Sequence, residues 1–207
     1  MPKQQPTGAR AIRTSTIPPS LMSILQEFQG CFYAASYQNF TALLCGWIFC
    51  IGRRSVSGAI RGARALGFRS HHSIFYAFFS RARWSVDAVG EVLFRLLLPL
   101  LDKRVFAVVD DTLCHKTGPK IFGAGMHFDG SKSSYQHGSP SRGKFISYGH
   151  SWVKLAVWLP VPFGVQRGFA IPVLFRLYRS KKLSPAAEYR KRTELAGDLL
   201  DLVVHWL

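Results

Sequence analysis

The first hundred residues repeat apolar positions at a spacing of three to four, which is typical of amphipathic helices. The same pattern continues in three further segments. They are 55–66, a stretch from about Ser73 that carries Phe75, Phe78 and Phe79, and 86–98. Gly67 separates the first two of these segments, and Pro99 ends the third. We therefore expect a mostly helical first half. Its two leading apolar stripes are Leu21, Ile24, Leu25 and Phe28, and Leu43, Leu44, Trp47, Ile48 and Ile51.

After residue 100 the pattern changes to that of β-strands. Both alternate sets of Val105–Val109 are apolar, which predicts a strand buried on both faces. Segments 151–160 and 168–178 predict two further strands with a turn at 162–164 between them, and Pro172 favours a bulge or an edge position. A long, mobile loop is expected over 112–146, since it is rich in Gly, Ser, Lys and His.

A final helix is predicted from Ala186 to Trp206, behind a cap at Ser184 and a proline at its first position. The fold class is therefore α+β. We expect a disordered basic tail over 1–20, a helical region over 21–100, and a domain of three strands and a helix over 101–207.

The chain is strongly basic, with 27 Lys and Arg, 11 Asp and Glu, and a net charge of +16. This surplus favours a polyanionic partner, most often nucleic acid, over the alternative of a membrane surface. The most apolar run, 40–51, is shorter than the about 20 residues that span a bilayer. The N-terminus lacks the apolar centre of a secretory signal, so we expect a cytoplasmic protein with no membrane partner.

The positive charge is one-sided between Gly52 and Trp84, a segment that contains no acid. Two short helices with a glycine turn between them, flanked by arginines, are the pattern of a helix-turn-helix DNA-binding motif. Arginine forms fork-shaped contacts with phosphate and with guanine edges. We therefore expect nucleic-acid contact here, through Arg53, Arg54, Arg61, Arg64, Arg69, Arg81 and Arg83.

Two adjacent carboxylates, Asp110 and Asp111, follow the apolar run of the first strand. Neighbouring strand residues face opposite sides, so both reach one metal ion only if the strand ends or bulges between them. The alternative is a purely structural role, in which either carboxylate caps the turn into the loop or pairs with Lys116. Lys116 and Lys120 are candidate contacts to a nucleic-acid backbone, with plain solvation as their alternative.

Several sequence blocks together resemble bacterial insertion-sequence transposases of the DDE superfamily, in the branch whose first motif is Asp-Asp-Thr. The resemblance covers most of residues 52–207 and is far more specific than the Asp-Asp-Thr motif alone. The blocks are Val109–Thr112, His115–Gly118, Ile121–Gly125, Tyr148–Trp152, Pro172–Arg179 and Tyr189–Leu195.

The resemblance implies an RNase H-like domain in which three carboxylates hold two divalent ions for in-line phosphodiester transfer. Mg²⁺ is the implied cofactor, because it prefers oxygen ligands and accepts substrate phosphate in its shell. In related transposases the first catalytic Asp directly precedes the Thr. The resemblance therefore implies Asp111 as the catalytic metal ligand, with Asp110 as second choice, and transposon terminal inverted repeats as the DNA partner.

The second Asp and the Glu of the family are not found, so we expect an N-terminal part of a transposase that is inactive alone. Glu188, Glu194, Asp198 and Asp201 fall on the last helix, before the element that should carry the second Asp. Tyr189 and Arg192 match half of a family signature around the catalytic Glu, but in the wrong element. The alternative is a non-enzymatic DNA-binding remnant that inhibits a full-length transposase. Either version implies a nucleoid-associated protein with no small-molecule substrate, able to associate with itself or with the full-length enzyme.

Other groupings carry less weight. Adjacent Cys114 and His115 diverge in an extended chain, which disfavours a nucleophile and base pair. Asp129 is expected in the mobile loop. The histidines His115, His127, His137 and His150 have spacings that match no familiar zinc site. The four cysteines show neither a CxxC pair nor a disulfide framework.

Overall fold

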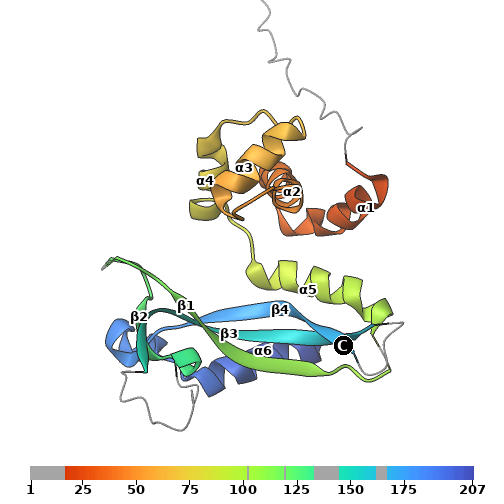
Figure 1. The fold of residues 1–207 in the computed structure, drawn as a ribbon. Helices are drawn as coiled ribbons and strands as arrows, with labels where there is room; N and C mark the ends of the chain where they lie inside the picture. The colour runs from red at the N-terminus through yellow and green to blue at the C-terminus, as the bar shows by residue number, and fades with distance from the viewer. Residues whose placement is uncertain (1–16, 102, 119, 133–144, 162–166) are drawn as a thin grey trace, which may run out of the picture. The chain divides into compact units, whose positions relative to one another are not determined.

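The structure is a computed structural model, and it describes residues 17–101, 103–118, 120–132, 145–161 and 167–207. The chain forms two compact units that divide between Val89 and Gly90. The first unit is helical, and the second combines a four-stranded antiparallel sheet with helices (Figure 1). This agrees with the predicted α+β class. Residues 1–16 of the expected tail (1–20), the turn at 162–164, and residues 119 and 133–144 of the predicted loop (112–146) lie outside the described residues. The end of the expected tail is not disordered, because Ile17 is buried and the first helix begins at Pro19.

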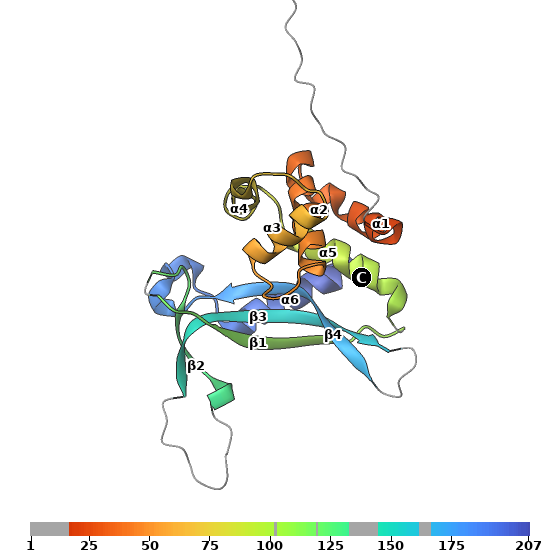
Figure 2. The ribbon, with the colours of Figure 1, turned by 45° about the horizontal axis from the view of Figure 1, so that its top comes forward.

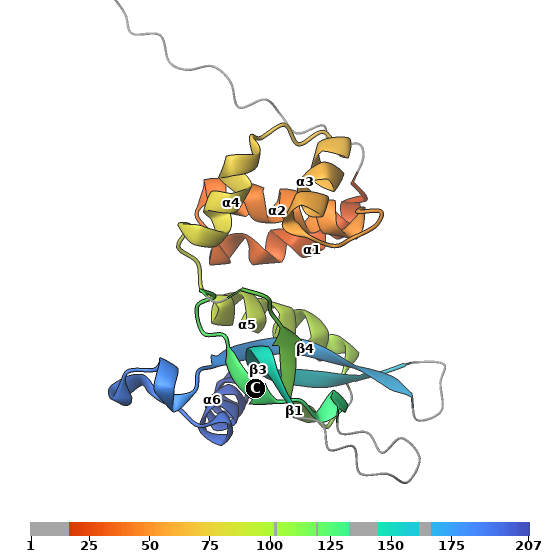
Figure 3. The same cartoon turned by 60° about the vertical axis from the view of Figure 1, so that its left-hand side comes forward.

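The described residues of the first unit form four α-helices before α5 (Val86–Leu97), and Figure 3 shows them gathered as a bundle. They are α1 (Pro19–Glu27), α2 (Ala34–Ile48), α3 (Val56–Ala65) and α4 (His72–Ser80), with a 3-10 turn η2 (Phe28–Cys31) after α1. The predicted stripes supply its core only in part. Ile48 and Ile51 are exposed, because α2 ends at Ile48, and Phe79 is also exposed. The buried residues include Leu25, Phe28, Leu43, Ile60, Phe75 and Phe78.

Helices α2 and α3 pack at very close range through small residues. A Cβ placed on Gly46 would overlap the carbonyl oxygen of Ala59, and one on Gly62 would overlap the carbonyl oxygen of Gly46. Ala59 and Ala63 are fully buried beside them. The glycines therefore let the two backbones touch, and this contact fixes α3 against the rest of the unit.

Local signals around α3 act as the sequence predicted. Ser55 is the N-cap, and its Oγ accepts a hydrogen bond from the N–H of Gly58 at 3.1 Å. Gly67 has a φ of 95°, a conformation that favours glycine, and it turns the chain toward α4. Helix α5 (Val86–Leu97) then passes into a 3-10 turn η3 (Leu98–Leu100) at Pro99, as predicted.

The sheet of the second unit is built around its long third strand (Figure 2). The strands are β1 (Ala107–His115), β2 (Gly125–Phe128), β3 (Ile146–Pro160) and β4 (Gly168–Tyr178). Strand β1 pairs with one edge of β3, while β4 and β2 pair with its other edge, because Gly149 lies opposite both His115 of β1 and Gly125 of β2. Strand β1 is therefore an edge strand of the described sheet.

Two predictions about this region are wrong. Strand β1 is not buried on both faces: Phe106, just before the strand, is 57% and Val108 43% exposed, and β1 is an edge strand that pairs only with β3 in the described sheet. The segment 112–146 is not all loop either. Strand β1 continues to His115, and β2 and a 3-10 turn η4 (Gly130–Lys132) follow. The predicted apolar run thus marks the entry to a longer strand.

Strand β4 has the predicted bounds, and Pro172 has the predicted bulge. The β3–β4 register shifts between Leu155 and Ala156, and Pro172 lies opposite Ala156. The strand pairs only with β3, so a residue without a backbone N–H is tolerated there. Helix α5 packs against this strand, since a Cβ on Gly90 would meet the carbonyl oxygen of Val173 at 2.5 Å.

The last helix, α6 (Arg192–Trp206), begins later than predicted. Its N-cap is Lys191 and not Ser184, because Tyr189 is extended (φ −70°, ψ 125°) and interrupts the helical turn. Two 3-10 turns, η5 (Lys181–Leu183) and η6 (Ala186–Glu188), occupy the intervening chain. Leu195, Leu199, Val203 and Trp206 of α6 bury against Val153, Leu155 and Val157 of β3. Helix α6 therefore covers the face that carries the odd-numbered residues of β3.

In the described parts of the chain, the search for a helix both long and apolar enough to cross a bilayer finds none.

Candidate functional site around Asp111

The two predicted carboxylates lie in the middle of β1 and point to opposite faces of the sheet. The ladder between β1 and β3 is regular here, with Asp110 opposite Lys154 and Asp111 opposite Val153. Val153 is buried under α6, so Asp111 lies on the α6 face and Asp110 on the other. Oδ1 of Asp110 accepts a hydrogen bond from the N–H of Asp111 at 2.8 Å. Both side chains remain exposed, and only one of them faces α6.

Asp111 lies beside four side chains brought together from four other elements, β2, β3, β4 and α6. We call Asp111, His127, Ser151, Tyr178 and Arg192 the Asp111 cluster. Its centre is Arg192, whose Nε lies 3.4 Å from Oδ2 of Asp111. The same Nε donates to Oγ of Ser151 at 3.1 Å, and Nη2 donates to Nδ1 of His127 at 3.3 Å. The guanidinium carbon lies 4.2 Å from the centre of the Tyr178 ring.

The register of the sheet explains this convergence. His127 lies opposite Ser147, and Tyr178 lies opposite Ser151. These positions and Asp111 are therefore on one face, and the first residue of α6 lies over them. Sequence reasoning did not predict His127, Ser151 or Tyr178. The half-match of Tyr189 and Arg192 to the family signature was the available signal for Arg192.

His127 is buried, at 5% exposed, and its pKa is lowered. Burial is the main cause, and the positive charge of Arg192 adds to it, while Asp111 acts in the opposite direction. Since Nδ1 accepts from Arg192, a neutral ring carries its proton on Nε2. Nε2 has no hydrogen-bond partner among the described residues. His127 is therefore a neutral support for the guanidinium.

Asp129 is buried, contrary to the prediction that it lies in a mobile loop. Its carboxylate accepts hydrogen bonds from the N–H and Oγ of Ser131, from Oγ of Ser147 and from Nε2 of His115, the last at 2.8 Å. The hydrogen bonds from Ser131 and Ser147 hold the pKa of Asp129 well below its ordinary range. Asp129 thus joins the chain after β2 to β1 and β3, as a structural carboxylate.

The weaker groupings do not gather into a site. His115 donates a hydrogen bond to Asp129, and its side chain lies on the other face of the sheet from that of Cys114. Cys114 pairs with His150 across the two strands. His150 bonds the carbonyl oxygen of Phe122 at 2.8 Å, and His137 lies outside the described residues. Where the structure describes the chain, it holds no group of three or more His, Cys, Asp or Glu side chains able to hold a metal. Lys116 and Lys120 are exposed.

The acids near the start of α6 pair with surface arginine. Arg190 lies 2.8 Å from Oδ1 of Asp198 and 3.5 Å from Oε2 of Glu194, and Glu194 also accepts from the N–H of Lys191. Glu188 lies 3.3 Å from Arg179. None of these contacts involves Asp111, which supports leaving Glu194 outside the catalytic set.

These residues fit only part of a DDE metal site. Asp111 offers an exposed carboxylate on a strand, which suits one hydrated Mg²⁺. A two-ion site needs several ligand side chains at fixed positions, and the described residues hold no group of three or more His, Cys, Asp or Glu side chains able to bind a metal. The chain as described therefore holds a divalent ion at most through Asp111 and water.

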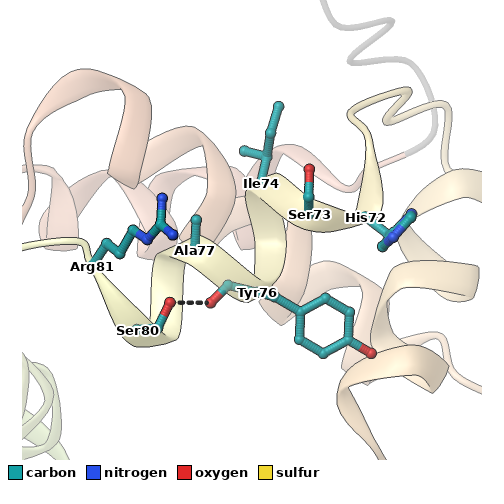
Figure 4. A pocket seen from close by; sticks show the side chains of 7 residues that line it. All are labelled: His72, Ser73, Ile74, Tyr76, Ala77, Ser80 and Arg81. Carbon is teal, nitrogen blue, oxygen red and sulfur yellow. Dashed lines mark hydrogen bonds between the residues drawn. The ribbon is translucent and has the colours of Figure 1, made fainter.

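The arginine-rich segment forms a surface on the helical unit. Its seven arginines are all exposed: Arg61 and Arg64 on α3, and Arg53, Arg54, Arg69, Arg81 and Arg83 in the adjoining turns. A shallow pocket of about 420 Å³ lies along α4, where His72, Ser73, Tyr76 and Arg81 are among the lining residues (Figure 4). Oη of Tyr76 forms a hydrogen bond with Oγ of Ser57 on α3 at 3.0 Å. Two adjoining helices thus present polar and basic side chains to solvent.

Comparison with protein families gives a match over most of the chain. The sequence model of a family described as DDE superfamily endonuclease matches residues 27–207, which includes the helical unit from η2 onward and the Asp111 cluster. No curated protein and no solved structure matches the chain.

Proposed function

Because the chain belongs to the DDE superfamily endonuclease family, we propose that it is a DNA-binding transposase protein of a bacterial insertion sequence. Members of this family generally use divalent metal ions, and DNA is the substrate that the family implies. The observation that carries the proposal is the match over residues 27–207, together with Asp111 placed exposed on a regular strand of the matched region.

Asp111 is the proposed metal-binding carboxylate, and Asp110 is not. Three features support this choice. Asp111 directly precedes Thr112, it faces α6 with the other polar groups of the cluster, and it is held on a strand paired along its whole length. The antiparallel arrangement of β1, β3 and β4 followed by α6 also supports an RNase H-like domain. Mg²⁺ is the proposed ion.

DNA binding is proposed for the arginines 53, 54, 61, 64, 69, 81 and 83, with Lys116 and Lys120 as backbone contacts near the catalytic strand. All nine side chains are exposed, and no acid interrupts the arginine segment. Terminal inverted repeats are the proposed specific target. A nucleoid-associated protein in the cytoplasm follows from this proposal.

We further propose that the described chain does not cleave DNA by itself, since one carboxylate cannot hold two ions in place. Because the described residues hold no group of three or more metal-ligating side chains, a second function is also favoured. In that case the protein occupies transposon ends and inhibits an active transposase, by binding DNA or by associating with that enzyme.

The test uses the full chain and labelled duplex DNA carrying candidate terminal repeats. We expect binding that weakens steeply with salt, because each phosphate contact releases counterions. We expect no Mg²⁺-dependent nicking or joining. Salt-insensitive or undetectable DNA binding would contradict the proposal, whereas nicking that Asp111→Asn abolishes would contradict only the claim of inactivity. Inhibition of an active transposase by added chain would support the second function.

A further inference from the structure

Arg192 is held in place by buried partners. Ser151, at 1% exposed, accepts from its Nε, and His127, at 5% exposed, accepts from its Nη2. The Tyr178 ring lies against the guanidinium, with 4.2 Å between the ring centre and Cζ, a distance typical of a cation–π contact. An arginine on a free surface would lose side-chain entropy on binding a ligand. Arg192 has already lost most of that freedom.

The same guanidinium remains open to a ligand. Its side chain is 39% exposed and that of Asp111 is 54% exposed. Nη1 has no hydrogen-bond partner among the described residues, so its two N–H groups are available. A guanidinium has five N–H donors in a planar fork that matches two oxygens of a phosphate. The Asp111 cluster therefore presents a fixed, partly free guanidinium fork, whose Nε lies 3.4 Å from Oδ2 of the proposed metal-binding carboxylate.

Neighbouring cations show why Arg192 differs from its surroundings. Arg190 is held by Asp198 and Glu194, and Arg179 by Glu188 and the carbonyl oxygen of Leu183. These carboxylates neutralise the two arginines. Among the acids of the described residues, Arg192 contacts only Asp111, through Nε. Nε also donates to Ser151, and Nη2 donates to the ring of His127.

We propose that Arg192 binds a phosphate of the DNA strand at the Asp111 site, as a substrate-binding residue. This inference rests on the proposed function, which gives Arg192, Ser151, His127 and Tyr178 no role. A phosphate oxygen bound near Asp111 lies within reach of the guanidinium, and the free Nη1 donates to it. Ser151, His127 and Tyr178 act through Arg192 by fixing its orientation.

The rival role is purely structural, in which Arg192 only pairs with Asp111 and anchors the start of α6. The two roles differ in their dependence on DNA. A phosphate contact contributes to the salt dependence of DNA binding, whereas an internal ion pair does not. Arg190 is a matched control, because it lies two residues away and is already paired with two carboxylates.

The first test measures binding of the full chain to a fluorescent 30-bp duplex across a salt series. Arg192→Gln keeps a donor for Ser151 and removes the charge. We expect it to weaken binding by about fivefold and to lower the slope of log affinity against log salt by about 1. Arg192→Lys keeps the charge and should keep the slope. Arg190→Gln should match the wild type in both quantities.

The second test locates the contact directly. Arg192→Cys and Arg190→Cys are introduced into a chain whose four natural cysteines are replaced by serine, and each is labelled with a photoreactive azidophenacyl group. We expect the label at position 192 to crosslink to the duplex several times more efficiently than the label at 190. Unfolding midpoints within a few degrees of the wild type verify that every variant is folded.

Equal slopes for wild type and Arg192→Gln, with equal crosslinking at 192 and 190, would overturn this inference. If the wild type still binds DNA with a steep salt dependence in that case, the proposed function stands. Loss of salt-sensitive binding by the wild type itself would instead contradict the proposed function.

Discussion

The N–H of Asp111 donates a 2.8 Å hydrogen bond to Oδ1 of Asp110, although the two side chains lie on opposite faces of the sheet. The pair therefore does not form a shared metal site. Only Asp111 faces α6 and the fixed guanidinium of Arg192, so the two adjacent acids have different surroundings and different expected roles.

The buried carboxylate of Asp129 makes the folding stability of the protein depend on pH in the acidic range. Its folded-state pKa is depressed below the ordinary value near 4, so its stabilisation is present in full above about pH 4 and is lost as the pH falls further. We expect Asp129→Asn to lower the thermal unfolding midpoint at pH 7 by about 5 °C. Thermal unfolding between pH 3 and pH 7 measures this difference. A difference that stays constant below pH 4 would contradict the assignment.

His127 should titrate below the ordinary histidine range, because burial and the charge of Arg192 both disfavour its protonated form. We expect its ring signals, followed by NMR against pH, to shift with a midpoint below 6.5, the usual histidine value. Arg192→Gln should raise that midpoint without restoring the usual value, since burial is the larger cause. An unchanged midpoint in this variant would show that the guanidinium does not act on the ring.

Glycine-to-alanine changes in two helices should have opposite effects. Gly62→Ala forces a Cβ into the backbone of α2 and should cost about 2 kcal/mol or more of unfolding free energy. Gly197→Ala meets nothing within 4 Å on α6 and should stabilise by about 0.5 kcal/mol or more through helix propensity. Denaturant unfolding of the two variants measures both effects. Equal effects would refute the close α2–α3 contact.

Local signals in the sequence predicted the elements that local chemistry controls. The Ser55 cap, the turn at Gly67 and the bulge next to Pro172 are confirmed, because each depends on a few neighbouring residues. The start of α6 was predicted too early. The serine and proline signals at 184 and 185 open a 3-10 turn instead, and the extended Tyr189 delays the helix.

Nonlocal pairing decided what the sequence could not predict. Strand β2 lies in a Gly-rich segment and forms because its four residues pair with the start of β3. Asp129 is buried for the same reason, since Ser147 and His115 reach it from two strands. Arg192 meets Asp111 only when α6 lies over the sheet. The Asp-Asp-Thr motif predicted one member of the site, and its neighbours required the fold.

The most direct test of the account asks whether Asp111, and not Asp110, binds a divalent ion. Mn²⁺ prefers the same oxygen ligands as Mg²⁺ and broadens the NMR signals of nearby nuclei. We predict that low Mn²⁺ concentrations broaden the backbone signals of residues 110–112 and 152–154 in the wild type and in Asp110→Asn, but not in Asp111→Asn. Broadening that persists in Asp111→Asn and disappears in Asp110→Asn would contradict the account.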